Sequence, residues 1–472
     1  MIIIDDMGIE KDKSDGQVFT PDFIVREMLD NINYNSAEII EKHVIDNSCG
    51  DGAFLYEVVK RYIYWGLQSK SSEEVAEDLS IFVHGIDVDD VAIGLCIEKL
   101  NSLVRENSLP EVDWDIRVSD ALSETSYDGK MDYVVGNPPY VRIHNINDNR
   151  DDVKKFTFAN GGMTDLYLVF FEIGFRMLNN SGVMTYITPS SWLSSLAGNE
   201  LRRFISRERN MISLVDLGHY QAFDGVTTYT IISTFTKCTR SSDFDYFEFD
   251  ANDKKRKFIE RLNYNECVID GCFYLSDKKT LSLLKQIKSV GKSDIKVKNG
   301  FATLSDKSFI GNDIPDSNIT IPIVKASTGK WSKCLFPYDK SGKPLNREEI
   351  FSNDNVCKHY ENNKEKILKG KAEYEGWWLY GRTQALSDVW SDKVSINVLV
   401  REHKDLKIQD VPAGMGIYSG LYILGCDIDE IKKKLMTDDF INYLKALKKY
   451  KSGGYYTFSS KDLEQFLTFA LK

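Results

Sequence analysis

The segment Asn137-Pro138-Pro139-Tyr140 has the clearest chemical meaning in this sequence, and it directly follows the apolar run 131–136. Proline has no N–H and a fixed φ, so the two prolines can hold the Asn137 amide and the Pro138 carbonyl rigidly, as two acceptors that point the same way. Two fixed acceptors suit one NH₂ group, and accepting its hydrogens favours electron density on a conjugated nitrogen as it attacks an electrophile. The Tyr140 ring offers a face for stacking a planar group. The alternative is a strand that ends in a Pro-Pro turn with an asparagine cap.

Acidic side chains end three expected strands earlier in the chain. Asp46 precedes a turn that contains Gly50 and Gly52, and Asp87 and Asp120 each follow a later apolar run. Glycines let a ligand approach the backbone, and a carboxylate at a strand end can bind the two hydroxyls of a ribose. A phosphate-binding GxGxxG pattern is absent from the sequence, and a carboxylate at the turn would repel pyrophosphate. A nucleoside without phosphates therefore fits better than NAD, with an ordinary tight turn as the alternative.

Short apolar runs alternate with helical patterns throughout the first half. The runs suit strands buried on both faces of a parallel sheet, and each helical pattern is long enough to cross over and cover a face. The expected strands are 44–46, 81–86, 131–136 and 182–188, and the expected helices are 54–65, 91–104 and 166–178. This alternation predicts an α/β fold with the acidic strand ends along the top of the sheet.

The charge of the chain is unevenly distributed. The 472 residues exceed one ordinary domain, and their net charge of −11 argues by itself against a phosphate-backbone partner. However, residues 1–240 carry −16 and residues 241–472 carry +5. The composition turns from acidic to basic near 240–265, so we expect one domain at 1–245 and a second at 246–472.

The sequence lacks the marks of a membrane, secreted or metal-binding protein. No stretch approaches the roughly 20 apolar residues that span a bilayer, and the start has neither a basic n-region nor a long apolar h-region. The eight cysteines form no C-x-x-C pair, and the six histidines show no metal-ligand spacing. We therefore expect a protein of the reducing cytoplasm, with no bound metal.

The ordered motifs resemble those of S-adenosylmethionine-dependent DNA N6-adenine methyltransferases. The resemblance rests on the segment 16–29 (GQVFTPDFIVREML), the turn 46–54 (DNSCGDGAF), Asp87, Asp120 and the NPPY segment at 137–140. Their order, followed by a long carboxyl-terminal region, resembles the gamma group, which includes type II modification methylases of TaqI-like or Eco57I-like layout. The resemblance implies a Rossmann-like methyltransferase sheet flanked by helices, followed by a mixed α+β target-recognition domain.

The resemblance also implies a cofactor role for each matching residue. Thr20 and Pro21 are expected at the methionine end of S-adenosylmethionine, Asp87 at its ribose and Asp120 at its adenine amino group. The full set expected to bind the cofactor is Thr20, Pro21, Asp46, Ser48, Gly50, Asp87, Val88, Asp120, Ala121 and Asn137. Two positions depart from the family's pattern: Asn47 stands where proline is usual, which loosens the turn, and Ala121 stands where a bulky side chain often stacks on the cofactor.

Catalysis is implied at the NPPY segment. Asn137 and Pro138 are expected to hold the target amine, Tyr140 to stack on a flipped-out adenine, and Phe223 to close on the other face of that base. The expected catalytic set is Asn137, Pro138, Pro139, Tyr140 and Phe223, with a core position as the alternative for Phe223. Adenine is favoured over cytosine because N4-cytosine enzymes more often carry serine in place of Asn137. The protein then has to align amine, methyl carbon and sulfur and to exclude water, with no metal.

The second half carries candidate DNA contacts. Residues 281–300 contain five lysines and one aspartate and are expected to face phosphates, with a solvated helix face as the alternative. Arginine reads guanine and glutamine reads adenine in the major groove, so Arg382 and Gln384 are candidate base contacts. Segments like 380–384 and 453–460 recur in family members with different targets, which favours backbone or scaffold contacts instead.

The sequence therefore predicts a sequence-specific adenine-N6 methyltransferase that flips its target base, acts on double-stranded DNA as a monomer, and belongs to a restriction-modification system or is an orphan methylase. RNA or a protein glutamine is the alternative substrate, because the acceptor pair suits any conjugated NH₂ group. A DNA-binding module that has lost catalysis is the second alternative. No nuclease signature precedes the segment 16–29, so any cognate restriction endonuclease is expected to be a separate protein.

Overall fold

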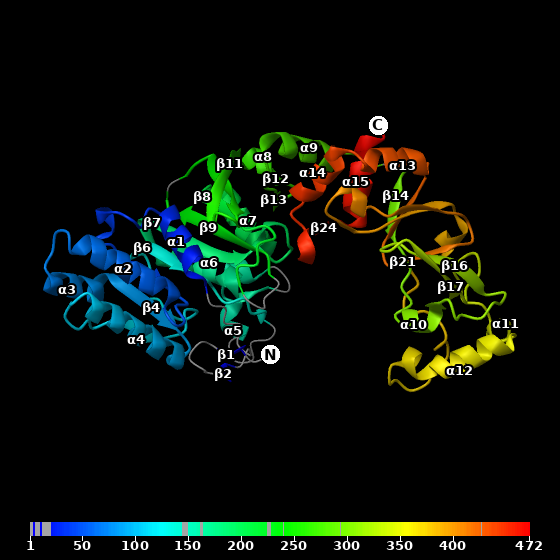
Figure 1. The fold of residues 1–472 in the computed structure, drawn as a ribbon, viewed down its shortest axis with the longest axis horizontal. Coiled ribbons are helices and arrows are strands. Elements are labelled where there is room, and N and C mark those ends of the chain that lie inside the picture. The colour runs from blue at the N-terminus through cyan, green and yellow to red at the C-terminus, as the bar shows by residue number, and fades with distance from the viewer. Residues whose placement is uncertain are drawn as a thin grey trace. The chain divides into compact units, whose positions relative to one another are not determined.

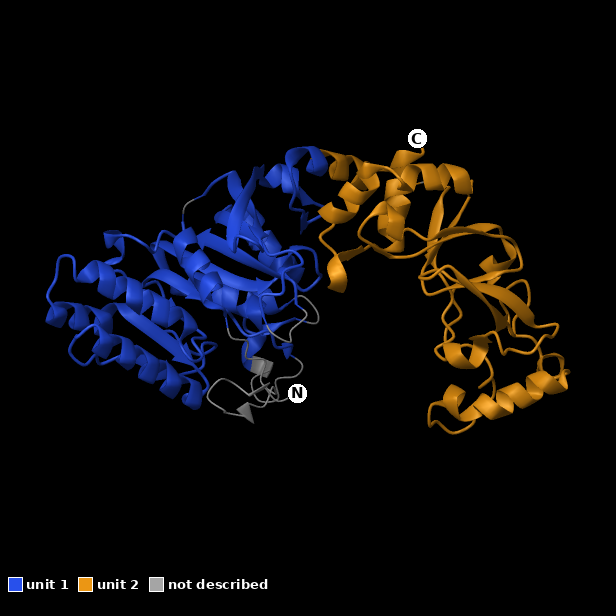
Figure 2. Cartoon of the chain, viewed as in Figure 1, with its two compact units in different colours: residues 1–281 blue, residues 282–472 orange. Residues whose placement is uncertain are grey.

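The computed structural model forms two compact units, residues 1–281 and 282–472 (Figure 2). The described residues are 3–4, 10–11, 20–143, 150–160, 164–223, 228–238, 240–292, 294–425 and 427–472. The division falls later than the expected boundary at 245/246. The reason is that residues 243–263 form two strands that pair with the sheet of the first unit, although the composition changes from acidic to basic within them.

A nine-stranded sheet forms the centre of the first unit (Figure 1), in the order β11-β10-β8-β9-β7-β6-β3-β4-β5. In chain order its strands are β3 (Val44–Asp46), β4 (Val83–Asp87), β5 (Asp115–Val118), β6 (Met131–Gly136), β7 (Leu178–Pro189), β8 (Met211–Asp216), β9 (Thr230–Thr236), β10 (Asp243–Asp250) and β11 (Lys255–Asn263). Strands β3 to β7 pair in parallel, whereas β9 lies antiparallel between β7 and β8. The strand order reverses between β3 and β6, and ligands of such sheets bind outside the carboxyl ends of the strands at this point.

Helices cover both faces of this sheet. They are α1 (Asp22–Asn31), α2 (Ala53–Gly66), α3 (Ser72–Phe82), α4 (Asp90–Glu106), α6 (Leu166–Met177) and α7 (Asn199–Glu208). The buried residues of α1, α2 and α4 share one core with Ile187 of β7, whereas the neighbouring Tyr186 packs on Phe171 of α6, with ring centroids 5.7 Å apart. Successive strand residues point to opposite faces, so α6 lies on the other side from α1, α2 and α4. The predicted α/β fold is confirmed.

The predicted elements of the first half differ from the observed ones chiefly at 81–86. Ile81 and Phe82 end helix α3, and the strand begins only at Val83. Helix α3 starts at a capping box between Ser71 and Glu74 and continues up to the strand. Smaller elements of this unit are β1 (Ile3–Ile4), β2 (Glu10–Lys11), α5 (Arg150–Val153), α8 (Tyr264–Cys267), β12 (Val268–Ile269) and β13 (Cys272–Phe273).

The second unit is a mixed α+β structure, as predicted, with three small sheets. Their orders are β14-β22-β18-β20, β15-β17-β16-β21 and β19-β24-β23. The strands are β14 (Lys296–Asn299), β15 (Ile310–Gly311), β16 (Thr320–Lys325), β17 (Lys330–Leu335), β18 (Lys393–Ile396), β19 (Leu399–Val400), β20 (Ile408–Val411), β21 (Gly416–Tyr418), β22 (Leu421–Leu424), β23 (Tyr450–Lys451) and β24 (Tyr455–Thr457). The helices are α9 (Lys278–Lys288), α10 (Asp306–Phe309), α11 (Arg347–Ile350), α12 (Asp354–Leu368), α13 (Ile428–Leu435), α14 (Asp438–Ala446) and α15 (Ser460–Ala470). In the described part of the chain, no helix combines the length and apolar character needed to cross a membrane.

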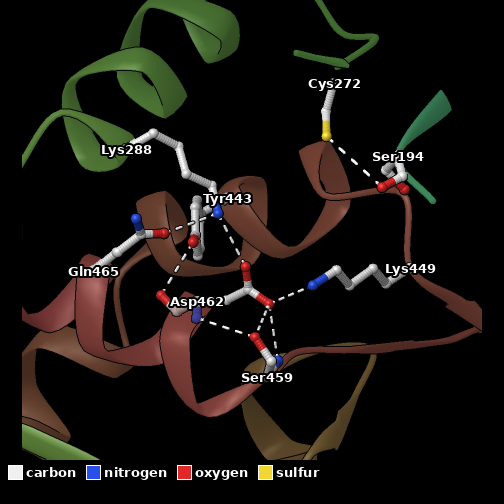
Figure 3. A network of polar contacts seen from close by, with 8 residues as sticks. All are labelled: Ser194, Cys272, Lys288, Tyr443, Lys449, Ser459, Asp462 and Gln465. Carbon is white, nitrogen blue, oxygen red and sulfur yellow. Dashed lines mark hydrogen bonds and ion pairs between the residues drawn. The ribbon is translucent and has the colours of Figure 1, made fainter. Parts of the chain in front are cut away.

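A buried carboxylate joins the end of α9 to α15 in this unit (Figure 3). Lys288 Nζ donates to Asp462 Oδ1 at 3.0 Å and to Gln465 Oε1 at 2.9 Å, while Lys449 and Ser459 donate to Asp462 Oδ2. Only 7% of the Lys288 side chain is exposed. The expectation that residues 281–300 face phosphates is therefore wrong for Lys288, because its charge is used inside the unit.

Candidate functional site

The turn between β3 and α2 needs glycine at two positions. Gly50 and Gly52 have φ values of 50° and 86°, a region that other residues rarely adopt. A Cβ atom on Gly52 would also lie 2.5 Å from the sulfur of Cys96 in α4. The turn therefore packs tightly against α4 at Gly52. The backbone at Gly50 is accessible, since a Cβ on Gly50 would meet no atom within 4 Å.

The Asp87 carboxylate at the end of β4 holds this turn in place. Its Oδ2 accepts a hydrogen bond from the Gly50 N–H at 2.8 Å, and its Oδ1 accepts one from the Asp89 N–H at 3.0 Å. Asp120 shapes the next loop in a similar way, with Oδ1 accepting from the Leu122 N–H at 2.9 Å. Both carboxylates lie at the strand ends where the sequence predicts them, and both order the loops around them.

The Asp46 carboxyl group is buried under the turn. Only 1% of the residue is exposed, and its Oδ1 accepts a hydrogen bond from the Ser48 N–H at 3.1 Å. Burial raises the pKa of Asp46 to about 8, the charge of Asp87 adds to the rise, and the Ser48 N–H opposes it. Near neutral pH the protonated form therefore prevails, and a nearby cation would favour its ionisation.

The NPPY segment lies beside this turn and contacts the segment that precedes α1. Asn137 Nδ2 donates to Thr20 Oγ1 at 3.1 Å, which fixes the orientation of the amide. The preceding Gly136 has a φ of 154°, and a Cβ there would lie 2.8 Å from Asp46 Oδ1. Three motifs that are far apart in the sequence, at Thr20, Asp46 and Asn137, thus meet at the carboxyl ends of β3 and β6.

A single cavity of about 490 Å³ joins these groups. Its lining residues are Thr20, Asp46, Asn47, Ser48, Cys49, Gly50, Asp51, Ala53, Phe54, Asp87, Val88, Asp89, Ala92, Ser119, Asp120, Ala121, Leu122, Asn137, Pro138, Pro139, Tyr140, Leu166 and Phe170. Twelve residues of the predicted cofactor and catalytic sets are among them. The sequence motifs do not predict the apolar wall formed by Phe54, Leu166 and Phe170, although Phe54 lies two positions after Gly52.

The cavity suits a cationic ligand without phosphates. Five aspartates line it, and its described lining includes no lysine, arginine or histidine. The Ser48 hydroxyl is buried and has no hydrogen-bond partner among the described residues, so it can serve a ligand. S-adenosylmethionine, which has a sulfonium and an ammonium group but no phosphate, fits this set of donors and acceptors.

Pro21 and Phe223 do not line the cavity. Pro21 stands at the start of α1, where its carbonyl accepts hydrogen bonds from the N–H groups of Ile24 and Val25. Phe223 is only 3% exposed and packs edge-on against Tyr140, with ring centroids 6.1 Å apart and planes at 70°. The expected sandwich is therefore absent from this arrangement, because the two rings contact each other and leave no parallel slot for a base. Residues 224–227, which follow Phe223, lie outside the described residues.

Arg382 and Gln384 lie on one loop of the second unit and differ in their contacts. Gln384 Nε2 donates to the Gly300 carbonyl at 3.0 Å, which supports the scaffold interpretation for that residue. Arg382 is exposed. The aromatic residues Trp377 and Tyr380 nearby belong to the core of the unit and do not offer free faces for stacking.

Comparison with known proteins identifies relatives of the chain. Residues 60–223 match the family described as Eco57I restriction-modification methylase. The type II restriction enzyme and methyltransferase RM.Eco57I of Escherichia coli is 26% identical over 502 residues, which cover 82% of this chain and 49% of that protein. The type II methyltransferase M.BstVI of Geobacillus stearothermophilus is 25% identical and covers 73% of this chain and 72% of its own length. These matches confirm the resemblance predicted from the motifs, and the chain spans about half of RM.Eco57I.

A solved structure shares the fold. The type IIL restriction-modification enzyme MmeI, in complex with DNA, superimposes with a TM-score of 0.62 and 13% identity, over 93% of this chain and 64% of its own. At this identity the likeness concerns the fold alone.

Proposed function

We propose that this chain, which matches the Eco57I restriction-modification methylases, is a DNA methyltransferase that moves a methyl group from S-adenosylmethionine to N6 of adenine in duplex DNA. One observation carries the proposal. The acidic pocket and the NPPY segment open into the same cavity, so a cationic nucleoside and an amine held by Asn137 and Pro138 can meet there. The names of the relatives and the fold shared with a DNA-bound enzyme support DNA as the substrate.

The strand ends of β3, β4 and β5 are proposed to hold the cofactor. When bound, S-adenosylmethionine supplies a methyl group that its sulfonium already activates. Asp46 pairs with its positive end, Asp87 accepts hydrogen bonds from the ribose hydroxyls, and Asp120 accepts one from the adenine amino group. The exposed Val88 and the buried Ala121 lie beside these carboxylates and cover the faces of the adenine.

The NPPY segment is proposed to position the target amine. Asn137 Oδ1 and the Pro138 carbonyl accept the two hydrogens of N6, which directs its electron pair at the methyl carbon. Thr20 keeps the Asn137 amide in that orientation through its 3.1 Å hydrogen bond. Positioning of the two reactants and exclusion of water then provide the rate enhancement.

The target base has to leave the duplex to reach this cavity. Unstacking costs a few kcal/mol, and stacking on Tyr140 offsets part of that cost. The Tyr140 hydroxyl donates to the Ile187 carbonyl at 3.2 Å, which fixes the ring against β7. Phe223 takes the second face only after its edge contact with Tyr140 opens, so we propose that base entry separates these two rings.

The test is methyl transfer from labelled cofactor to a duplex DNA library, followed by nucleoside analysis. N6-methyladenine is the expected product, and Asn137→Ala is expected to lower the rate by about 10² to 10³-fold, the typical effect of losing one fixed hydrogen bond in a transition state. Asn179→Ala is the matched control. Asn179 Nδ2 donates to Asp132 Oδ1 at 3.0 Å. These two residues lie near the beginnings of β7 and β6, at the ends of the strands opposite to the NPPY segment, so loss of the Asn179 amide should leave the rate unchanged.

Substrate competition separates the alternatives. Duplex DNA, single-stranded RNA and a glutamine-containing peptide are offered together, and label is expected in the duplex alone. Label in RNA or peptide, or N4-methylcytosine as the product, would contradict the proposal. A protein that binds DNA and transfers no methyl group to any of the three would be a binding module.

A further inference from the structure

Three residues around β7 are unusual for their places in the fold. Gly174 lies in the interior of helix α6, where glycine costs about 0.5–1 kcal/mol relative to alanine. Tyr186 carries a hydroxyl group into a fully buried stretch of β7, with 0% of the residue exposed. Asn47 is 1% exposed, at the turn position where the resembled family usually has proline.

A hydrogen bond joins Tyr186 to Asn47, and Gly174 leaves room for the Tyr186 side chain. The Tyr186 hydroxyl donates to Asn47 Oδ1 at 2.9 Å, and Asn47 Nδ2 reaches the sulfur of Met177 at 3.8 Å. A Cβ on Gly174 would lie 2.8 Å from the Tyr186 hydroxyl and 2.3 Å from the Met184 sulfur, so only glycine leaves room for the tyrosine. The Asn47 side chain is thus anchored in the core.

The Asn47–Tyr186 hydrogen bond links the glycine turn to the strands beside the NPPY segment. Asn47 directly follows Asp46, at the start of the glycine turn. Tyr186 is the register partner of Gly136, the residue before Asn137. The hydrogen bond therefore connects the glycine turn to β7, which is the neighbour of β6, the strand that precedes the NPPY segment.

We infer that the Asn47–Tyr186 hydrogen bond is a latch that sets the glycine turn in position for the cofactor, in place of proline. Both residues are positioning residues, and the inference rests on the proposed function for the identity of the ligand. A proline would fix the turn through its ring, whereas Asn47 fixes it through a side-chain bond to β7. The latch thereby makes the geometry of the turn depend on the strand next to the NPPY segment.

The test compares S-adenosylmethionine affinity and thermal stability in the wild type, Asn47→Pro, Tyr186→Phe and the double variant. Each single change leaves a buried polar group without its partner, so each is expected to weaken binding by about tenfold. The double variant has proline at position 47 and no hydroxyl group at position 186, so neither polar group of the pair is left without its partner. Its affinity for S-adenosylmethionine is expected to return to within about threefold of the wild type.

A control separates positioning from general stability. Tyr264→Phe removes another buried tyrosine hydroxyl, which accepts from the Met211 N–H at 3.2 Å, at the start of β8 and away from the cavity. This variant is expected to lose stability like Tyr186→Phe while its affinity for S-adenosylmethionine stays unchanged.

Two results would overturn the latch: Tyr186→Phe binding as tightly as the wild type, or a double variant that binds as weakly as the single variants combined. Weakened single variants together with an absence of methyl transfer to DNA by the wild type would leave the latch standing and refute the proposed function alone. A wild type that does not bind S-adenosylmethionine would refute both.

Discussion

The fold changes the ordinary acidity of the Asp46 carboxyl group in the candidate site. Burial raises its pKa to about 8, so the apoprotein holds a proton there near neutral pH. A bound cation favours the ionised form, which means that binding releases this proton. Affinity for the cation should therefore rise with pH until about 8 and then level off.

This pH dependence is testable through Asp46→Asn, which keeps the shape of the side chain and cannot ionise. For the wild type, the affinity for S-adenosylmethionine is expected to fall by up to about tenfold for each pH unit below the pKa of Asp46. The variant is expected to bind weakly, with only the pH dependence that the ligand's own amino group contributes. Calorimetry at several pH values measures the difference between the two proteins. Parallel pH profiles would contradict the assignment of Asp46 to the cationic end.

At the scale of elements, the packing of α9 against α15 depends on the buried carboxylate of Asp462. Burial by itself would raise the pKa of Asp462, but Lys288 and Lys449 hold it well below its usual range. The folded-state pKa is thus lower than the unfolded value of about 3.9, so the ionised group contributes stability above that pH and loses it as pH falls. Lys288 depends on this counter-charge more than Lys449 does, because 7% of the Lys288 side chain is exposed against 37% of the Lys449 side chain.

We expect Asp462→Asn to destabilise the second unit by about 3–5 kcal/mol near pH 7, because the buried Lys288 then lacks its counter-charge. The penalty should shrink as pH falls below about 4, because Asp462 of the unfolded wild type takes up a proton there, whereas the folded wild type keeps the carboxylate ionised. Denaturant unfolding at several pH values measures both effects. Asp316→Asn is the matched control, since Asp316 pairs with Lys333 while 81% of its side chain is exposed, and its loss is expected to cost less than about 1 kcal/mol.

At the scale of the whole molecule, the charge is divided unequally between the two halves of the chain. The −11 of the chain combines an acidic first half, which includes the five aspartates of the cavity, with a second half that carries a positive excess. Not every lysine of that excess is available to DNA, because Lys288 and Lys298 form ion pairs within the second unit. Exposed cations such as Arg382 remain as candidates for the phosphate backbone.

Arg382→Ala is expected to weaken binding to all duplex sequences alike and to lower the salt slope of the affinity by about 1, the signature of one lost phosphate contact. The same slope in both proteins, combined with a relaxed target preference, would identify a base contact instead. Titrations at several salt concentrations measure the slope. Arg105→Ala, at the exposed end of α4 in the first unit, is the control for a general loss of charge.

Much of the fold and site follows from local sequence. The strand at 131–136 and the helix at 166–178 were predicted almost to their ends, because their apolar periodicity and bounding residues act within a few positions. The acidic strand ends and the NPPY segment were also predicted to share one edge, since parallel strands bring their carboxyl ends together. The two compact units divide at 281/282, later than the change of composition at 240–265, because strand pairing continues to 263.

The sequence by itself thus determined the chemistry of the site: which acceptors, which carboxylates and which glycine turn are present, and in what order. Only the tertiary structure decided which side chains meet. It bonds Thr20 to Asn137, packs Phe223 edge-on against Tyr140, and ties Asn47 to Tyr186 across 139 positions of the chain. Such pairs depend on how helices and strands far apart in the sequence pack in the core, and no local pattern records that packing.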